Sequence, residues 1–193
     1  MRIVLASASP RRKELLDAVG LRFDVVASAV DEDGHEGNAS RHETVMRNAA
    51  MKARDVAAGI DGDAIVIGAD TLVFAGDHVF GKPGNMDEAK EMLGLLNGRT
   101  HQVITGVAVV RVPDGVEVTG HEITDVTFRR LSSREIERYL DKIDPHDRAG
   151  AYTVDGAGSL LVERFAGCFY NVLGLPLVRL DIMLRQFGIS LFD

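Results

Sequence analysis

The chain has 193 residues, of which 46% are hydrophobic and 26% are charged, values typical of a soluble globular protein. The length predicts a single domain, residues 1–193, with two lobes. The net charge of -7 argues against broad binding to nucleic acid polymers. The single cysteine excludes an internal disulfide framework. No segment has the length and hydrophobicity of a membrane span, and the N-terminus lacks a signal-peptide layout, so a cytoplasmic location is expected.

The first predicted elements are a short strand over residues 2–5 and a helix that follows it. Ser9 is a suitable N-cap whose hydroxyl could accept a backbone N–H, and Pro10 suits the first helical position. The turn between strand and helix carries hydroxyls, and residues 11–13 are all basic. A helix N-terminus with these cations favours an anion such as phosphate, although a solvated basic face explains the same pattern.

A second strand is predicted over residues 23–27, followed by a polar acidic loop over residues 31–38. This loop could hold a divalent metal or could simply be solvated. Ser40 and Glu43 have the spacing of a capping box and start the next helix. Lys52 on that helix is most simply a surface lysine, unless its face meets a site.

Residues 63–74 form a continuous apolar run that predicts a strand buried on both faces. Asp70 and Thr71 interrupt this run. A buried carboxylate must be paired, hydrogen-bonded, metal-bound or protonated, so Asp70 is a candidate functional residue; the alternative is a structural aspartate satisfied by backbone N–H groups. Gly68 would let another backbone or a ligand approach closely. A turn at Gly76-Asp77 and a short return strand at Val79-Phe80 are predicted next, and Lys82, in the turn that follows them, could reach a phosphate or be exposed.

The rest of the chain continues to alternate between helices and strands. A helix starts after Asn85, a hairpin pairs residues 103–110 with residues 116–129, and Ser132 caps a further helix. A strand at residues 160–163 and a last helix introduced by residues 171–176 follow. The pattern predicts an α/β protein with a mixed, twisted sheet flanked by helices.

Six motifs in order resemble those of the Maf proteins, and the match extends over nearly the full chain. They are Ser7-Ala8-Ser9-Pro10-Arg11-Arg12, Gly68-Ala69-Asp70-Thr71, Gly81-Lys82-Pro83, Arg99-x-His101-x-Val103-x-Thr105-Gly106, Ala149-Gly150-Ala151-Tyr152 and Asn171-Val172-x-Gly174-Leu175-Pro176. Each motif alone is weak, but six at compatible spacing make a specific signal.

The resemblance implies an inosine-triphosphatase-like (Maf/Ham1) fold with a cleft between two lobes, and a homodimer. It implies hydrolysis of nucleoside triphosphates to the monophosphate and pyrophosphate with a divalent cation, Mg²⁺ or Mn²⁺. Asp70 matches the family's catalytic carboxylate, and Arg12 and Thr71 match positions linked to base selection. The positions that match polar groups around the phosphates and the metal are Ser7, Glu32, Lys52 and Lys82. Asp70 could be base, metal ligand or both.

One position departs from the branch of the family that acts on dTTP and UTP. That branch has Gln three residues after the Tyr of the Ala-Gly-Ala-Tyr motif, whereas this chain has Asp155. Gln both donates and accepts hydrogen bonds, and an ionised Asp only accepts. The expected substrates are dTTP and UTP. The alternatives are the same reaction on modified or other nucleotides, and a non-enzymatic protein that regulates septum formation in cell division.

Overall fold

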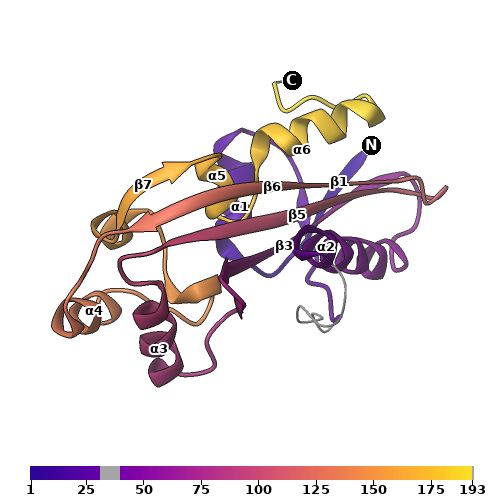
Figure 1. Ribbon diagram of the computed structural model, residues 1–193. Helices are drawn as coiled ribbons and strands as arrows, with labels where there is room; N and C mark the ends of the chain where they lie inside the picture. Colours follow the sequence, from indigo (N-terminus) through magenta and orange to yellow (C-terminus); the bar gives the residue numbers. More distant parts are fainter. Residues whose placement is uncertain (31–39, 193) are drawn as a thin grey trace. The chain divides into compact units, whose positions relative to one another are not determined.

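The computed structural model describes residues 1–30 and 40–192 (Figure 1). The acidic loop over residues 31–38, with Glu32, therefore lies outside the described residues. The elements in chain order are β1 (Arg2–Ala6), α1 (Pro10–Ala18), β2 (Asp24–Val25), α2 (Arg41–Ala57), β3 (Ala64–Ala75), β4 (His78–Phe80), α3 (Met86–Leu96), β5 (Thr100–Val112), β6 (Glu117–Phe128), α4 (Ser133–Leu140), the 3₁₀ turns η1 (Ala149–Ala151) and η2 (Gly156–Leu160), β7 (Val162–Ala166), α5 (Phe169–Val172), α6 (Leu177–Leu184) and η3 (Arg185–Phe187).

The strands form a mixed sheet in the order β2-β1-β3-β5-β6-β7, and β4 also pairs with β3. β1 is parallel to both β2 and β3, whereas β3 with β4 and β6 with β7 are antiparallel. The prediction of an α/β protein with a mixed sheet is therefore confirmed. In the part of the chain that the structure describes, no helix is both long and apolar enough to span a bilayer.

The chain divides into two compact units, which are described separately. Unit 1 comprises Met1–Asp70, Thr105–Glu122 and Gly174–Asp193, and unit 2 comprises Thr71–Ile104 and Ile123–Leu173. The boundary falls inside β3, between Asp70 and Thr71.

The core of unit 1 lies between α2 and the strands. Val4, Ala49, Ala53 and Val66 are fully buried in one cluster there. α2 begins with the predicted capping box, in which the Ser40 N–H donates to the Glu43 carboxylate at 2.7 Å. Its small buried residues leave room for the helix to lie close to the sheet.

Glycines in two strands let the α2 backbone approach the sheet directly. A Cβ atom at Gly68 would lie 2.2 Å from the Ala49 carbonyl oxygen, and one at Gly106 would lie 2.3 Å from the Val45 carbonyl oxygen. Both distances are far shorter than van der Waals contact, so only glycine fits at either position. The predicted close approach at Gly68 is thus made by the backbone of α2.

Several predicted boundaries were wrong. The second strand covers only Asp24–Val25, although the Val26 N–H still donates to the Leu5 carbonyl at 3.1 Å. The late strand begins at Val162, since Gly156–Leu160 forms a 3₁₀ turn. Ser9 is the N-cap of α1, but its side chain makes no capping hydrogen bond.

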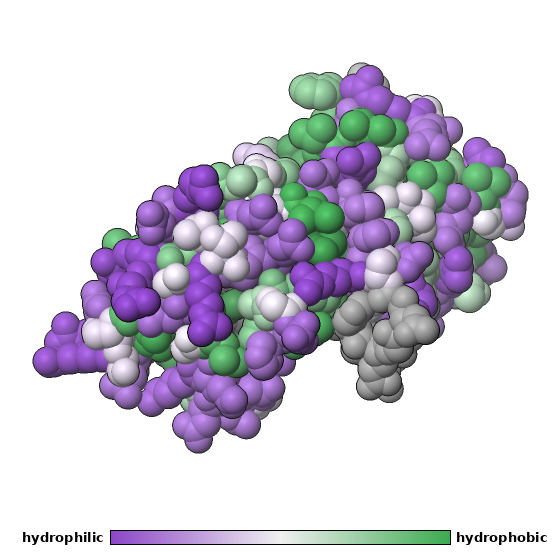
Figure 2. Space-filling view, in the orientation of Figure 1, coloured by the Kyte–Doolittle hydropathy of each residue, from purple (hydrophilic) through white to green (hydrophobic). Residues whose placement is uncertain are grey.

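The surface of unit 1 includes hydrophobic residues over α6, as Figure 2 shows. The side chains of Val178 and Ile182, one helical turn apart, are 70% and 50% exposed. The opposite face of α6 carries Leu180 and Leu184, which are fully buried. Both faces of this helix therefore carry large apolar residues.

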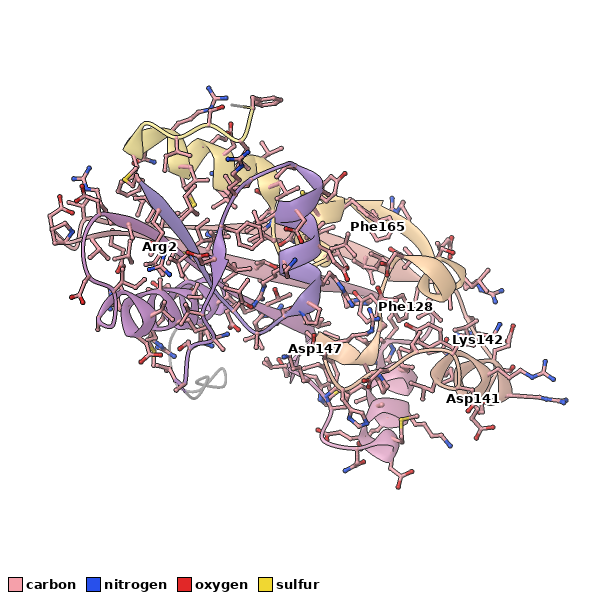
Figure 3. All side chains as sticks on the ribbon, turned by 180° about the vertical axis from the view of Figure 1, so that it is seen from behind. Arg2, Phe128, Asp141, Lys142, Asp147 and Phe165 are labelled. Atoms are coloured by element: carbon pink, nitrogen blue, oxygen red, sulfur yellow. The ribbon has the colours of Figure 1, made fainter. Side chains whose placement is uncertain are left out.

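The core of unit 2 contains a buried polar pair, His101 and Tyr152, from two of the motifs. His101 is 2% exposed, and its Nε2 and the Tyr152 hydroxyl form a hydrogen bond of 2.8 Å. Both rings lie edge-on to Phe128, which Figure 3 labels, with centroids 4.8 Å away in each case. Burial lowers the pKa of His101 to about 4, against a smaller opposing effect of Asp125, and burial raises the pKa of Tyr152. These motif residues therefore have a packing role.

The low pKa of His101 predicts that stability falls in mild acid. Unfolded His101 binds a proton near pH 6.5, whereas the folded protein resists that proton until pH is about 4. The stabilisation is therefore complete above pH 6.5 and is lost between pH 6.5 and 4, by about 3 kcal/mol. Urea unfolding from pH 7 to 4 should show this extra loss in the wild type but not in His101→Gln. Tyr152→Phe keeps the imidazole of His101 and should therefore retain the loss. Parallel plots of the free energy of unfolding against pH for the wild type and His101→Gln would contradict the assignment.

Candidate functional site

The candidate site of unit 1 is centred on Asp70, which lies in β3 and is 2% exposed. Its Oδ1 accepts a hydrogen bond from Lys52 Nζ at 2.9 Å, and its Oδ2 accepts one from Asn48 Nδ2, also at 2.9 Å. The Lys52 ammonium also donates to the Ala69 carbonyl at 3.4 Å. The buried carboxylate is thus paired with a cation and with an amide donor, as burial of a charge requires.

Of the two interpretations of Lys52 that the sequence left open, the exposed surface lysine is wrong. The residue is only 8% exposed, because the close contact of α2 with the sheet directs its side chain along buried surface to Asp70. Asn48 and Lys52 lie four residues apart and therefore on the same helix face. Sequence reasoning did not identify Asn48 as part of the site. Its position three residues after the buried Val45 was the signal that could have found it.

Arg12 and Ser7 are brought together at the start of α1. The Ser7 hydroxyl oxygen accepts hydrogen bonds from the Ser9 N–H and from Arg12 Nη1, each at 3.2 Å. Arg12 Nε also donates to the Gly174 carbonyl at 2.8 Å. Ser7 therefore bridges the backbone at the N-cap Ser9 and the Arg12 guanidinium, and Arg12 is also held by a backbone carbonyl 162 residues away in sequence.

The candidate residues of unit 2 are more exposed than those of unit 1. Lys82 forms an ion pair of 2.5 Å with Asp147, which is labelled in Figure 3, and the side chains are 53% and 45% exposed. The Asp155 carboxylate accepts a hydrogen bond from the Thr153 hydroxyl. Thr71 is partly buried and directly follows Asp70 in β3.

The described residues offer few ligands for a divalent metal. None of the residues in 1–30 and 40–192 form a group of three or more His, Cys, Asp or Glu side chains suited to an ion. Asp70 remains a possible ligand, because a carboxylate has about four acceptor positions and the hydrogen bonds from Asn48 and Lys52 occupy two of them. Mg²⁺ often binds through one or two carboxylates, waters and substrate phosphates. A single carboxylate of this kind fits an ion whose other ligands are waters and phosphate oxygens.

Asn171, from the last of the six motifs, has a structural role in unit 2. It is fully buried, and its amide donates at 2.9 Å both to the Val103 carbonyl and to the Thr124 hydroxyl. Its side chain thus joins α5 to β5 and β6. The motifs consequently mix site residues with residues that hold the core.

Comparison with known proteins identifies the relatives of the chain. A dTTP/UTP pyrophosphatase of Desulforamulus reducens is 46% identical over 189 residues, which cover 98% of each chain. One of Moorella thermoacetica is 48% identical over 193 residues, covering 99% of this chain and 97% of that protein. Among solved structures, a HAM1 protein from Coxiella burnetii matches 68% of this chain and 74% of its own at 15% identity, with a TM-score of 0.48. A family described as Maf-like protein matches residues 2–187, and the chain therefore belongs to the Maf family.

Proposed function

We propose that this chain is a nucleoside triphosphate pyrophosphatase that hydrolyses dTTP and UTP to the nucleoside monophosphate and pyrophosphate. The observation that carries the proposal is the identity of 46% and 48%, over almost the full length, to relatives named dTTP/UTP pyrophosphatase. The buried, fixed carboxylate of Asp70 supports it, because hydrolysis needs a positioned proton acceptor.

Asp70 accepts a proton from the attacking water in this proposal. The water oxygen forms a bond to the α-phosphorus. The bond from that phosphorus to the α–β bridging oxygen breaks, and pyrophosphate leaves with that oxygen. Lys52 and Asn48 hold one carboxylate oxygen each, which fixes the direction in which the remaining acceptor positions point. Fixed orientation of a general base is a large part of its catalytic value.

The cations and polar groups of the chain bind the substrate. Arg12, Lys52 and Lys82 balance the phosphate charge, and Ser7 contributes a hydroxyl next to Arg12. Thr71, Arg12 and Asp155 contribute to base selection. Asp70 and Glu32 are the proposed ligands of Mg²⁺ or Mn²⁺, which when bound would neutralise phosphate charge and polarise the phosphorus centre. Of these residues, Glu32 lies outside the described ranges.

A homodimer and a cytoplasmic location remain predictions, as does the absence of binding to nucleic acid polymers or membranes. The exposed apolar face of α6, with Val178 and Ile182, is a surface that a dimer could bury. No observation on the described residues favours the non-enzymatic, septum-related alternative.

Asp70→Asn should abolish catalysis while the protein stays folded. Loss of a general base lowers turnover by about 100-fold or more. Pyrophosphate release from dTTP and UTP with Mg²⁺ or Mn²⁺ measures the effect, and circular dichroism checks the fold. Asp63→Asn, at an exposed aspartate just before β3, is the matched control and should keep wild-type activity. A folded Asp70→Asn protein with substantial activity would remove Asp70 from its proposed role.

A second candidate, the same reaction on modified or other nucleotides, is favoured by Asp155. Because an amide can donate and accept, Asp155→Gln should raise the ratio of kcat/KM for dTTP and UTP over purine triphosphates, by about tenfold. Glu163→Gln likewise replaces a carboxylate by an amide, at an exposed position in β7, and should leave the ratio unchanged. An unaltered ratio in Asp155→Gln would mean that Asp155 does not read the base.

A further inference from the structure

Unit 2 contains a cavity of about 170 Å³ beside α4. Its inner wall is apolar and includes Leu131 and Leu161, which are 8% and 2% exposed and belong to the core of the unit. Leu160, which is 61% exposed, and Ala157 line it from η2. The cavity therefore connects the core of unit 2 with the surface. Eight residues are proposed as substrate or metal ligands, and none of the seven that lie in the described part of the chain lines this cavity.

Charged side chains around this cavity are mainly basic. Arg129, Arg138 and Lys142 line it together with one carboxylate, Glu135, which gives a local charge of +2 in a chain whose net charge is -7. Such a concentration of one sign over an apolar wall favours an anionic ligand.

Arg129 and Glu135 are engaged with each other and with neighbouring groups. Arg129 Nε donates to the Leu160 carbonyl at 2.6 Å, and its Nη2 donates to Glu135 at 3.3 Å. The other carboxylate oxygen of Glu135 accepts from the Ser132 N–H and hydroxyl, each at 2.8 Å. These two residues form a fixed wall of the cavity.

Arg138 and Lys142, by contrast, are positioned to meet a ligand. They lie four residues apart, in α4 and just after it, and both are exposed (Figure 3 labels Lys142). Among the described residues neither side chain has an ion-pair partner, whereas the adjacent Glu137 is paired with Lys90. The two uncompensated cations therefore flank the mouth of the cavity.

The volume and the walls limit the ligand. A cavity of about 150 Å³ with apolar walls accommodates a benzene ring. This cavity is of similar size and has the ring of Tyr139 as a further wall. The Tyr139 hydroxyl accepts the Thr153 N–H at 2.9 Å, which fixes this side chain in the wall. A hydrated inorganic ion would gain nothing from these apolar walls.

We propose that this cavity is a second ligand site, which binds a compound with a single six-membered ring and an anionic group. The ring packs against Leu131, Leu161 and Tyr139, and the anion pairs with Arg138 and Lys142. An aromatic carboxylate and a pyrimidine nucleotide share this chemistry. The inference does not depend on the proposed hydrolysis, because it concerns equilibrium binding at residues outside the candidate site.

Calorimetry with four probes separates ring from charge. Benzoate has both features, benzyl alcohol has the ring alone, and inorganic phosphate has the charge alone. Benzoate should bind saturably and at least about tenfold more tightly than either of the other two, since each lacks one of the two contributions. UMP, added to the benzoate complex, distinguishes the two classes of ligand. If UMP displaces benzoate, the site binds pyrimidine nucleotides. If it does not, the ligand is an aromatic carboxylate.

Variants place the binding in the cavity. The double substitution Arg138→Gln and Lys142→Gln should weaken benzoate binding at least about tenfold. Ala157→Leu should fill part of the cavity and reduce binding similarly. Arg134→Gln, which changes a basic residue one turn earlier in α4 that does not line the cavity, is the control and should bind as the wild type does. The proposal is overturned if benzoate does not bind saturably, if phosphate alone binds equally well, or if the double variant retains wild-type affinity.

Discussion

The buried ion pair between Lys52 and Asp70 is the interaction on which the site depends. The two side chains are 10% and 3% exposed, and their charged atoms lie 2.9 Å apart. Removing two charges from water costs several kcal/mol per ion, which only good geometry and further hydrogen bonds can offset. Asn48 and the Ala69 carbonyl supply those hydrogen bonds. The cluster thus joins α2 to β3 through two side chains of the helix.

The packing of α2 on the sheet makes that geometry accessible. Gly68 and Gly106 remove the two Cβ atoms that would otherwise push the helix outward. The short side chain of Asn48 can then reach β3, and Lys52 can extend along the helix to the same carboxylate. Glycine in the strands, small residues in the helix and the polar cluster are therefore parts of one arrangement. Ser7 and Arg12 are fixed separately, through a network that ends at Gly174.

Periodicity and capping signals predicted most elements of the fold. The apolar run of β3 is buried nearly throughout, and α2 and α4 begin at the predicted capping boxes. The weak points were short elements such as β2, whose pairing depends on neighbours distant in sequence. The predicted capping role of Ser9 was wrong, because its side chain makes no hydrogen bond to the first turn of α1.

The candidate site could be predicted only in part. Asp70 was identified because a carboxylate in an apolar strand needs a partner, and that physical requirement is visible in the sequence. The identity of the partner was not visible, because helical periodicity gives the face of Lys52 but not the depth at which α2 packs. The role of Asn48 depends on the same depth. For His101 and Tyr152, the motif alone could not distinguish a reactive pair from a packed one.

A double-mutant cycle on Lys52 and Asp70 tests the central claim most directly. Lys52→Met, Asp70→Asn and the double variant, compared by urea unfolding, should give a coupling free energy of about 2 kcal/mol or more, because each single change leaves a buried polar group without its partner. The exposed pair Lys13 and Asp17, at 2.5 Å in α1, is the matched reference and should give less than about 1 kcal/mol. A coupling between Lys52 and Asp70 no larger than that of the exposed pair would contradict the account.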